Sequence, residues 1–145
     1  MLKNCRPALL ALALSFYVPV VSVAVELREV CSNTRCFQSE VMGTPQGRAL
    51  GLMSRESLAD DEAMLFVFDE PGEYTFWMKN MNFPIDIIWL DQDKRVVYCA
   101  LNVPPCSQDP CPVYAPQVKA LYVLEVAAGQ ADAGRIHSGD RLLWN

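Results

Sequence analysis

The residues best suited to chemistry are polar side chains inside the most apolar and aromatic part of the chain. Residues 76–91 contain Lys79, Asn80 and Asp86 among aromatic and aliphatic neighbours. A polar group buried in such surroundings without a partner costs about 2–7 kcal/mol. These side chains are therefore expected either to satisfy one another or to be kept for a ligand.

A binding site can be built from these residues together with one arginine and one tryptophan. Arginine offers a planar fork for carboxylate or phosphate, asparagine supplies a donor and an acceptor, and lysine contributes a point charge. The hypothesis is a polar cluster at the rim of an aromatic pocket that holds a small polar or anionic ligand, or an envelope component, against the indole ring. The candidate ligand-binding residues are Arg55, Trp77, Lys79, Asn80 and Asp86. The structural alternative is an ion pair between Arg55 and Asp86, with Lys79 extended over apolar surface.

The same cluster allows an enzymatic alternative. Asp86 would act as general base on an envelope metabolite while Lys79 or Arg55 stabilises a developing oxyanion. A neighbouring cation lowers the pKa of a carboxyl group and makes it a weaker base, so burial of Asp86 would have to oppose that effect. No catalytic residue is assigned on the sequence alone.

Metal chemistry has less support. Met78 and Met81, with Met53 and Met64 elsewhere, offer thioethers that suit Cu(I). However, methionine usually fills gaps in apolar cores, and strand alternation would send Met78 and Met81 to opposite faces. His137 is the single histidine, and the cysteine spacing does not match a zinc finger. We expect no metal and no cofactor, and a periplasmic copper-handling protein is kept as an alternative.

The N-terminal segment has the features of an export signal. Two basic residues precede a long apolar run, and small residues at 22–24 suit cleavage after Ala24. Residues 1–24 are therefore predicted to be a cleavable signal peptide, with the mature chain periplasmic or secreted. The alternative is an uncleaved anchor over 7–25, which is nearly long enough to span a bilayer. No other segment is, so no stable membrane span is expected after cleavage.

The charge balance excludes one class of partner. The net charge is −5 at pH 7, because 17 acidic residues outnumber 12 lysines and arginines. Removal of the predicted signal would make the chain more acidic still. Such a surface repels phosphate backbones, so no nucleic acid is expected as a partner.

The cysteines point to an oxidising compartment. In an exported chain they are expected to form disulfides. Among several possible pairings, Cys31 with Cys36 and Cys106 with Cys111 are favoured, because each pair flanks only four residues. Cys99 lies in an apolar run and is predicted to be a buried small hydrophobe. The second bridge would clip a proline-rich loop, which could serve as a lid or an interaction surface.

The apolar pattern predicts one β-rich domain over 37–145, preceded by a leader over 25–36 that carries the first cysteine pair. Short apolar runs alternate with turn residues, which is typical of a small barrel-like or sandwich-like antiparallel domain. One or two short helices are expected. The first would begin at Thr44 and Pro45, which suit an N-cap and a first helical position. The strands are predicted near 64–68, 74–78, 85–90, 95–101, 120–126 and 141–144.

Motifs spread over roughly residues 37–144 occur in the order of one known family. They are Gly51-Leu52-Met53 with Arg55, Met64-Leu65-Phe66 with Phe68, Phe76-Trp77-Met78-Lys79-Asn80, Pro84-Ile85-Asp86, Tyr114, Leu124-Glu125 with Gly129, and Gly139-Asp140. On these residues the chain resembles the prokaryotic domain of unknown function (DUF) 192 family. The resemblance implies a compact, mostly β, barrel-like domain, often exported, with no established activity. Ala63 stands where the family usually has glycine, and Met81 stands where it usually has threonine, which removes a hydroxyl group from the predicted site.

The sequence therefore predicts an exported β domain that binds a small polar or anionic ligand or an envelope component beside Trp77. An enzyme that uses Asp86, a copper-handling protein and a protein interaction module are the alternatives.

Overall fold

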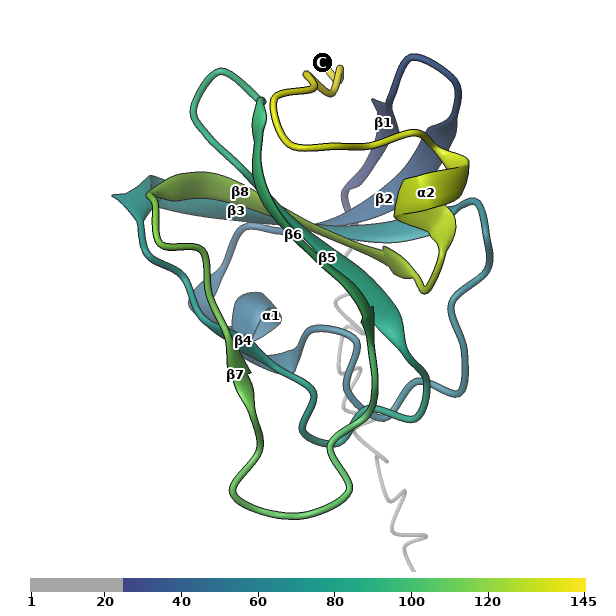
Figure 1. Ribbon diagram of the computed structural model, residues 1–145, viewed down its shortest axis with the longest axis vertical. Helices are drawn as coiled ribbons and strands as arrows, with labels where there is room; N and C mark the ends of the chain where they lie inside the picture. The colour runs from purple at the N-terminus through teal and green to yellow at the C-terminus, as the bar shows by residue number, and fades with distance from the viewer. Residues whose placement is uncertain (1–24) are drawn as a thin grey trace, which may run out of the picture.

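The computed structural model describes residues 25–145, so the predicted signal peptide lies outside the described residues. The strands are β1 (Leu27–Cys31), β2 (Cys36–Met42), β3 (Glu62–Gly72), β4 (Phe76–Trp77), β5 (Ile85–Leu90), β6 (Val96–Val103), β7 (Val113–Tyr114) and β8 (Ala120–Ala127). The helices are α1 (Pro45–Leu50) and α2 (Gln130–Ala133). Six strands form one sheet in the order β1-β2-β3-β8-β5-β6, and β4 pairs with β7 in a second, small sheet (Figure 1). The prediction of a mostly β fold with one or two short helices is confirmed.

The predicted leader is part of the main sheet. β1 pairs antiparallel with β2 along its whole length, and a disulfide joins Cys31 to Cys36 at the turn end of this hairpin. Val30 and Phe37 are paired across the two strands and are both buried. The folded unit therefore begins at β1 rather than at residue 37, because this strand contributes both backbone pairing and a core side chain.

The main sheet is open, so the expected barrel-like or sandwich-like domain is not a closed barrel. β2 and β3 run parallel, and the crossover between them carries α1, as parallel neighbours require. The other strand pairs are antiparallel. Near the C-terminus, residues 141–144 form no full strand. They make isolated bridges at Cys31–Leu143 and Arg95–Arg141, which link the two edge regions without closing the sheet.

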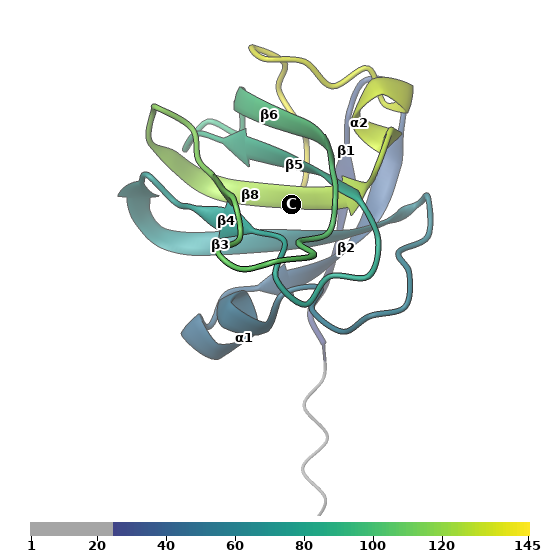
Figure 2. The ribbon, with the colours of Figure 1, turned by 60° about the horizontal axis from the view of Figure 1, so that its bottom comes forward.

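Both faces of the sheet are covered, and the interior strand β5 is buried along its entire length. Ile85, Ile87 and Trp89 face one core cluster, and Ile88 and Leu90 face the other. The face with Ile85, Ile87 and Trp89 is called the α1 face, and the face with Ile88 and Leu90 is called the α2 face, after the helix that lies on each side. In Figure 2, α1 lies below the sheet and α2 lies above it. The sheet and the core cluster on each of its faces therefore separate any site on one face from a site on the other.

The start of α1 follows the predicted capping chemistry. The Thr44 side chain accepts a hydrogen bond from the backbone N–H of Gly47 at 3.1 Å, and Pro45 occupies the first turn. The helix ends at Gly51, whose φ of 51° favours glycine. The chain then continues as an irregular segment along the α1 face, where Leu52 and Leu58 enter the core.

A second disulfide joins Cys106 to Cys111 in the proline-rich loop, which matches the favoured pairing. The loop is held to the segment after β4, because the backbone N–H of Cys106 donates to the carbonyl of Met78 at 3.0 Å. Cys99 is the free cysteine of the described residues, and burial raises the pKa of its thiol to about 11. No helix within residues 25–145 is long and apolar enough to cross a membrane.

Candidate functional site

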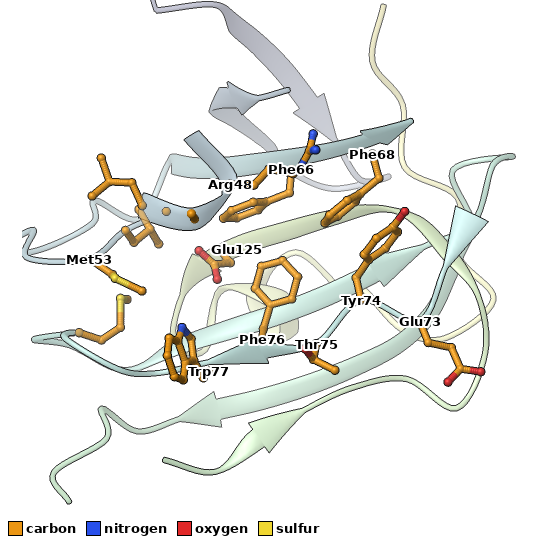
Figure 3. A pocket seen from close by; sticks show the side chains of 15 residues that line it. Arg48, Met53, Phe66, Phe68, Glu73, Tyr74, Thr75, Phe76, Trp77 and Glu125 are labelled. Atoms are coloured by element: carbon orange, nitrogen blue, oxygen red, sulfur yellow. The ribbon is translucent and has the colours of Figure 1, made fainter. Parts of the chain in front are cut away.

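A pocket of about 450 Å³ opens on the α1 face of the sheet (Figure 3). One wall is residues 48–53, where α1 ends and the chain turns back. The opposite wall is residues 73–77, which lead into β4. Phe66 and Phe68 of β3 and Glu125 of β8 form the sheet side. The pocket therefore exists because the α1 crossover and the small β4–β7 sheet stand apart over the same face.

Glu125 is the acidic group at the base of this pocket. In the sheet register it lies between Met64 of β3 and Ile87 of β5, in the middle of the central strands. Its side chain is only 5 % exposed. Figure 3 shows the carboxyl group directed into the pocket among Phe66, Phe76 and Trp77. An acidic residue thus occupies a position that the sheet otherwise gives to apolar side chains.

The Glu125 carboxyl group has no protein partner among residues 25–145. Burial is the sole cause that raises the pKa of Glu125 from 4.5 to about 8, with no neighbouring hydrogen bond or cation lowering it. No fully buried side-chain oxygen in the described residues lacks a partner. The Glu125 oxygens are therefore accessible from the pocket, and desolvation leaves the group largely protonated at neutral pH.

Five aromatic rings contribute to the pocket wall. Phe66 and Phe76 meet edge to face with ring centroids 4.9 Å apart, and Phe76 makes a similar contact with Trp89 below it. Phe68 and Tyr74 stack with centroids 3.4 Å apart at the far end. These contacts fix the rings, so the pocket has preformed walls.

Arg48 is the one cation that lines the pocket in the described structure, and it is already engaged. Its guanidinium donates to the carbonyl of Gly43 at 2.7 Å and to that of Val67 at 2.8 Å. It also lies over the Phe68 ring at 5.0 Å. Arg48 therefore ties α1 to β3 and does not neutralise Glu125.

Two residues of the predicted cluster lie together near the pocket mouth. Trp77 lines the pocket and is 48 % exposed. The ammonium of Lys79 lies 5.6 Å from the Trp77 ring centroid and is paired with Asp109 at 3.1 Å. Lys79 thereby connects β4 to the disulfide-bridged loop.

Arg55 pairs with a residue that the sequence analysis did not consider. Its two terminal nitrogens donate to the Glu40 carboxylate at 2.7 and 2.6 Å. This hydrogen-bonded ion pair holds the pKa of Glu40 below its usual range and raises that of Arg55. The alternative of an Arg55–Asp86 ion pair is wrong, because the parallel β2–β3 arrangement brings Glu40 to Arg55 instead.

Asp86 lies on the α2 face, away from the pocket. The side chain is fully buried. Its two oxygens accept backbone N–H groups of Asn102 at 2.8 Å and Ala131 at 3.0 Å. Asp86 therefore joins β5 to β6 and to α2, and the structure does not bring it to the other predicted site residues.

Asn80 has a backbone role beside the pocket. Its φ of 58° lies in the left-handed region, which asparagine tolerates better than most residues. Its carbonyl accepts the backbone N–H of Ser54 at 2.9 Å, and its side-chain nitrogen lies 4.0 Å from the sulfur of Met53. Asn80 thus braces the wall that contains Met53.

The thioethers weighed as copper ligands are divided between two cavities. Met53 and Met81 line the main pocket. Met78 is buried and lines a separate small cavity beneath the proline-rich loop. Met78 and Met81 lie outside the strands and pack in the same core cluster, so the expectation that alternation sends them to opposite faces is wrong, although they line different cavities.

Glu125 lines the pocket but was not among the candidate site residues predicted from the sequence. Its signal was present, because it is the single acidic residue in the apolar run 120–126 that contributes β8. Alternation along that run also places it with Val123 on one face. The motif Leu124-Glu125 belongs to the family resemblance, which implies no role for Glu125.

Comparisons with known proteins give a family and two related structures. The family model of DUF192, described as an uncharacterized ACR, matches residues 28–144. A crystal structure described as a putative transcription regulator from Sinorhizobium meliloti is 29 % identical, with a TM-score of 0.78, over 85 % of this chain and 97 % of that one. A protein of unknown function from Novosphingobium aromaticivorans is 33 % identical, with a TM-score of 0.74, over 91 % of this chain and 94 % of that one. No curated protein matches significantly.

Proposed function

The chain belongs to the DUF192 family, whose description assigns no activity, and we propose from the pocket itself that the protein binds a small organic ligand. Glu125 accepts a hydrogen bond from a donor group of the ligand, and the apolar part of the ligand packs against Phe66 and Phe76. Trp77 closes the mouth. The bound molecule is thus held by one polar contact at the base and by aromatic contact around it.

The unpartnered carboxyl group carries this proposal. Burying a carboxyl group without a partner is costly, and such a cost is usually met by hydrogen bonds or by a ligand. Asp86 illustrates the first solution, with two backbone N–H donors. Glu125 has neither a donor nor a cation from residues 25–145. A ligand that donates to it would recover the missing interaction.

The dimensions of the pocket support a small molecule. Its volume of about 450 Å³ falls in the range of about 300–1,000 Å³ that is typical of such sites. The lining combines aromatic and aliphatic side chains with several polar groups, as is common for a ligand pocket. Met53 and Met81 add flexible side chains that can adapt to the shape of the ligand.

The proposed function retains one residue of the cluster predicted from the sequence as a ligand contact and gives three others structural roles. Trp77 remains a ligand-contacting residue, whereas Arg55, Lys79 and Asn80 support the walls through their contacts with Glu40, Asp109 and Met53. The expected preference for an anion is replaced, since the buried ionisable group of the pocket is an acid.

General acid–base catalysis by Glu125 is the second candidate. Burial raises the pKa of Glu125 to about 8, close to neutrality, where a group exchanges protons most effectively. In this case turnover of a bound metabolite would be lost in Glu125→Gln, although the ligand would still enter the pocket. Asp86 is unsuited to this role, because its oxygens already accept two backbone donors.

Export is part of the proposal. Two disulfides are consistent with an oxidising compartment, and the signal-like residues 1–24 supply a route. The ligand would then be a molecule of the cell envelope or its surroundings.

The proposal is tested by mass spectrometry of small molecules that co-purify with the protein from the envelope fraction of its host. We expect a ligand on the wild-type protein and on the control Glu56→Gln, which changes an exposed glutamate. Glu125→Gln should lose it. If all three carry the same molecules in the same amounts, or none carries any, the proposed function is contradicted.

A further inference from the structure

We propose that the ligand of this pocket is an organic cation with N–H donors, such as a primary ammonium group on an aromatic or aliphatic body, bound through Glu125 with its apolar part against Phe66 and Phe76. The inference rests on the proposed function and specifies its ligand class. It assigns the charged contact to the base of the pocket and the apolar contact to the walls.

The first argument is the hydrogen-bonding inventory of Glu125. An ionised carboxylate only accepts hydrogen bonds, and both of its oxygens are without protein donors in residues 25–145. A primary ammonium group has three donors and a positive charge, so it satisfies both oxygens and compensates the buried charge together. A ligand carboxylate would instead place a second acid beside the first, in a site that offers it no free cation.

The second argument is the arrangement of aromatic rings around the carboxyl group. The faces of aromatic rings attract cations within about 6 Å of the ring centroid. The protein uses this contact twice at the pocket margin, with Arg48 over Phe68 at 5.0 Å and Lys79 beside Trp77 at 5.6 Å. Phe66 and Phe76 carry no such internal cation in the described structure and lie beside Glu125 (Figure 3). Phe66 and Phe76 are therefore the rings available to the cationic group of a ligand.

The other charged and titratable groups that line the pocket do not oppose this assignment. Arg48 comes from α1 and is held by two carbonyl groups. Glu73 and Tyr74 come from the segment that precedes β4, and the exposed Glu73 side chain points away from the pocket (Figure 3). The sheet strands add only Phe66, Phe68 and Glu125 to the lining. The charge that meets a ligand at the base of the pocket is therefore negative whenever Glu125 ionises.

The affinity of the pocket for an organic cation should depend on pH. Burial raises the pKa of Glu125 to about 8, so the ligand-free carboxyl group must lose a proton before it can pair with an ammonium ion. Binding of the cation then becomes tighter as pH rises from 6 toward 8.5. A neutral ligand that accepts a hydrogen bond from protonated Glu125 would show the opposite trend.

Three probes of similar size separate these cases: benzylammonium, its neutral analogue benzyl alcohol, and benzyltrimethylammonium, which is a cation without N–H donors. Affinity is measured by calorimetry and by tryptophan fluorescence in phosphate buffer, since amine buffers would compete. We expect benzylammonium to bind at least tenfold more tightly than either analogue. Glu125→Gln should lower its affinity at least tenfold, and Glu56→Gln should leave it unchanged.

The outcomes distinguish this inference from the function on which it rests. Equal binding of benzyl alcohol, or unchanged binding of benzylammonium to folded Glu125→Gln, overturns the cation assignment and leaves a binding pocket. Failure of all three probes, with a co-purified ligand that lacks a cationic nitrogen, also overturns only the assignment. Failure of the probes together with an empty wild-type protein overturns both. Glu125→Asp retains the charge on a shorter side chain, so it should keep part of the affinity if the inference is right.

Discussion

Asp86 and Glu125 are two buried acids on neighbouring strands, and their surroundings differ completely. Asp86 of β5 lies on the α2 face, where two backbone N–H groups donate to its oxygens. Glu125 of β8 lies on the α1 face at the base of a pocket, without a donor from the described residues. Burial alone therefore does not mark a functional acid. What separates the two is whether the protein itself supplies the partners.

The two faces differ in the same way. On the α2 face, α2 and the C-terminal segment are packed against the sheet, and Ala131, Ile136 and Trp144 fill the core. On the α1 face, the short helix α1 buries none of its own residues, and the space between it and β4 remains open. The α2 face therefore contributes mainly to stability, whereas the α1 face is less completely packed and contains a cavity.

Loss of the Asp86 carboxylate should have the largest effect on stability. Asp86→Ala removes the acceptors of the Asn102 and Ala131 N–H groups from a buried position and should lower the free energy of unfolding by about 2–5 kcal/mol. Denaturant unfolding at pH 7 measures this loss. The control is Asp93→Ala, in an exposed turn, which should change stability by less than about 0.5 kcal/mol. A loss at Asp86 as small as that of the control would remove the distinction between the two acids.

Glu125→Gln should have the opposite sign, and its effect should depend on pH. The folded-state pKa of about 8 lies above the ordinary value of 4.5, so the folded protein binds the proton more strongly than the unfolded chain. Wild-type stability therefore falls as pH rises from about 4.5 to about 8, and the glutamine variant lacks this fall. We expect the variant to be more stable by a few kcal/mol above pH 8 and close to wild type at pH 4.

Denaturant unfolding of both proteins between pH 4 and 9 provides the comparison. A stabilised but binding-deficient variant would be typical of a site at which function opposes stability. If Glu125→Gln instead destabilises the protein at every pH, Glu125 has a structural partner and resembles Asp86 after all.

The Arg55–Glu40 pair should give the smallest effect, because it is partly exposed. A double-mutant cycle with Arg55→Ala and Glu40→Ala should yield a coupling of about 1 kcal/mol. Arg55 lowers the pKa of Glu40, so the coupling is present above the ordinary pKa of 4.5 and is lost as pH falls through the lowered value. Cycles measured at pH 7 and pH 3 should differ accordingly. An equal coupling at both pH values would show that Arg55 acts through packing rather than through charge.

Local sequence signals predicted much of the fold. Thr44 and Pro45 gave the start of α1, the four-residue spacing gave both disulfides, and alternating apolar runs gave the β content. These features depend on neighbours in the chain, so their patterns are visible before folding. The open sheet was not predictable in this way, because the parallel pairing of β2 with β3 depends on a crossover of nineteen residues between them.

Of the predicted ligand-binding residues, Trp77 alone lines the pocket within the described structure. Arg55 and Asp86 were expected to meet, but strand order sends Asp86 to the far face and brings Glu40 to Arg55. Glu125 was overlooked, because a single acidic residue in an apolar strand can be recognised as part of a pocket only when the elements that lie over it are known. That cover comes from α1 and β4, which are distant in sequence, and no local pattern reports it.

The most direct test of the account is the pKa of Glu125, measured by NMR titration of its carboxyl carbon in the ligand-free protein and again with saturating benzylammonium. We predict a value near 8 without ligand and a clear decrease when the cation binds, because the bound charge favours the ionised form. A ligand-free value near the ordinary 4.5, unchanged by the cation, would contradict the claim that this pocket holds an unpartnered acid for a ligand.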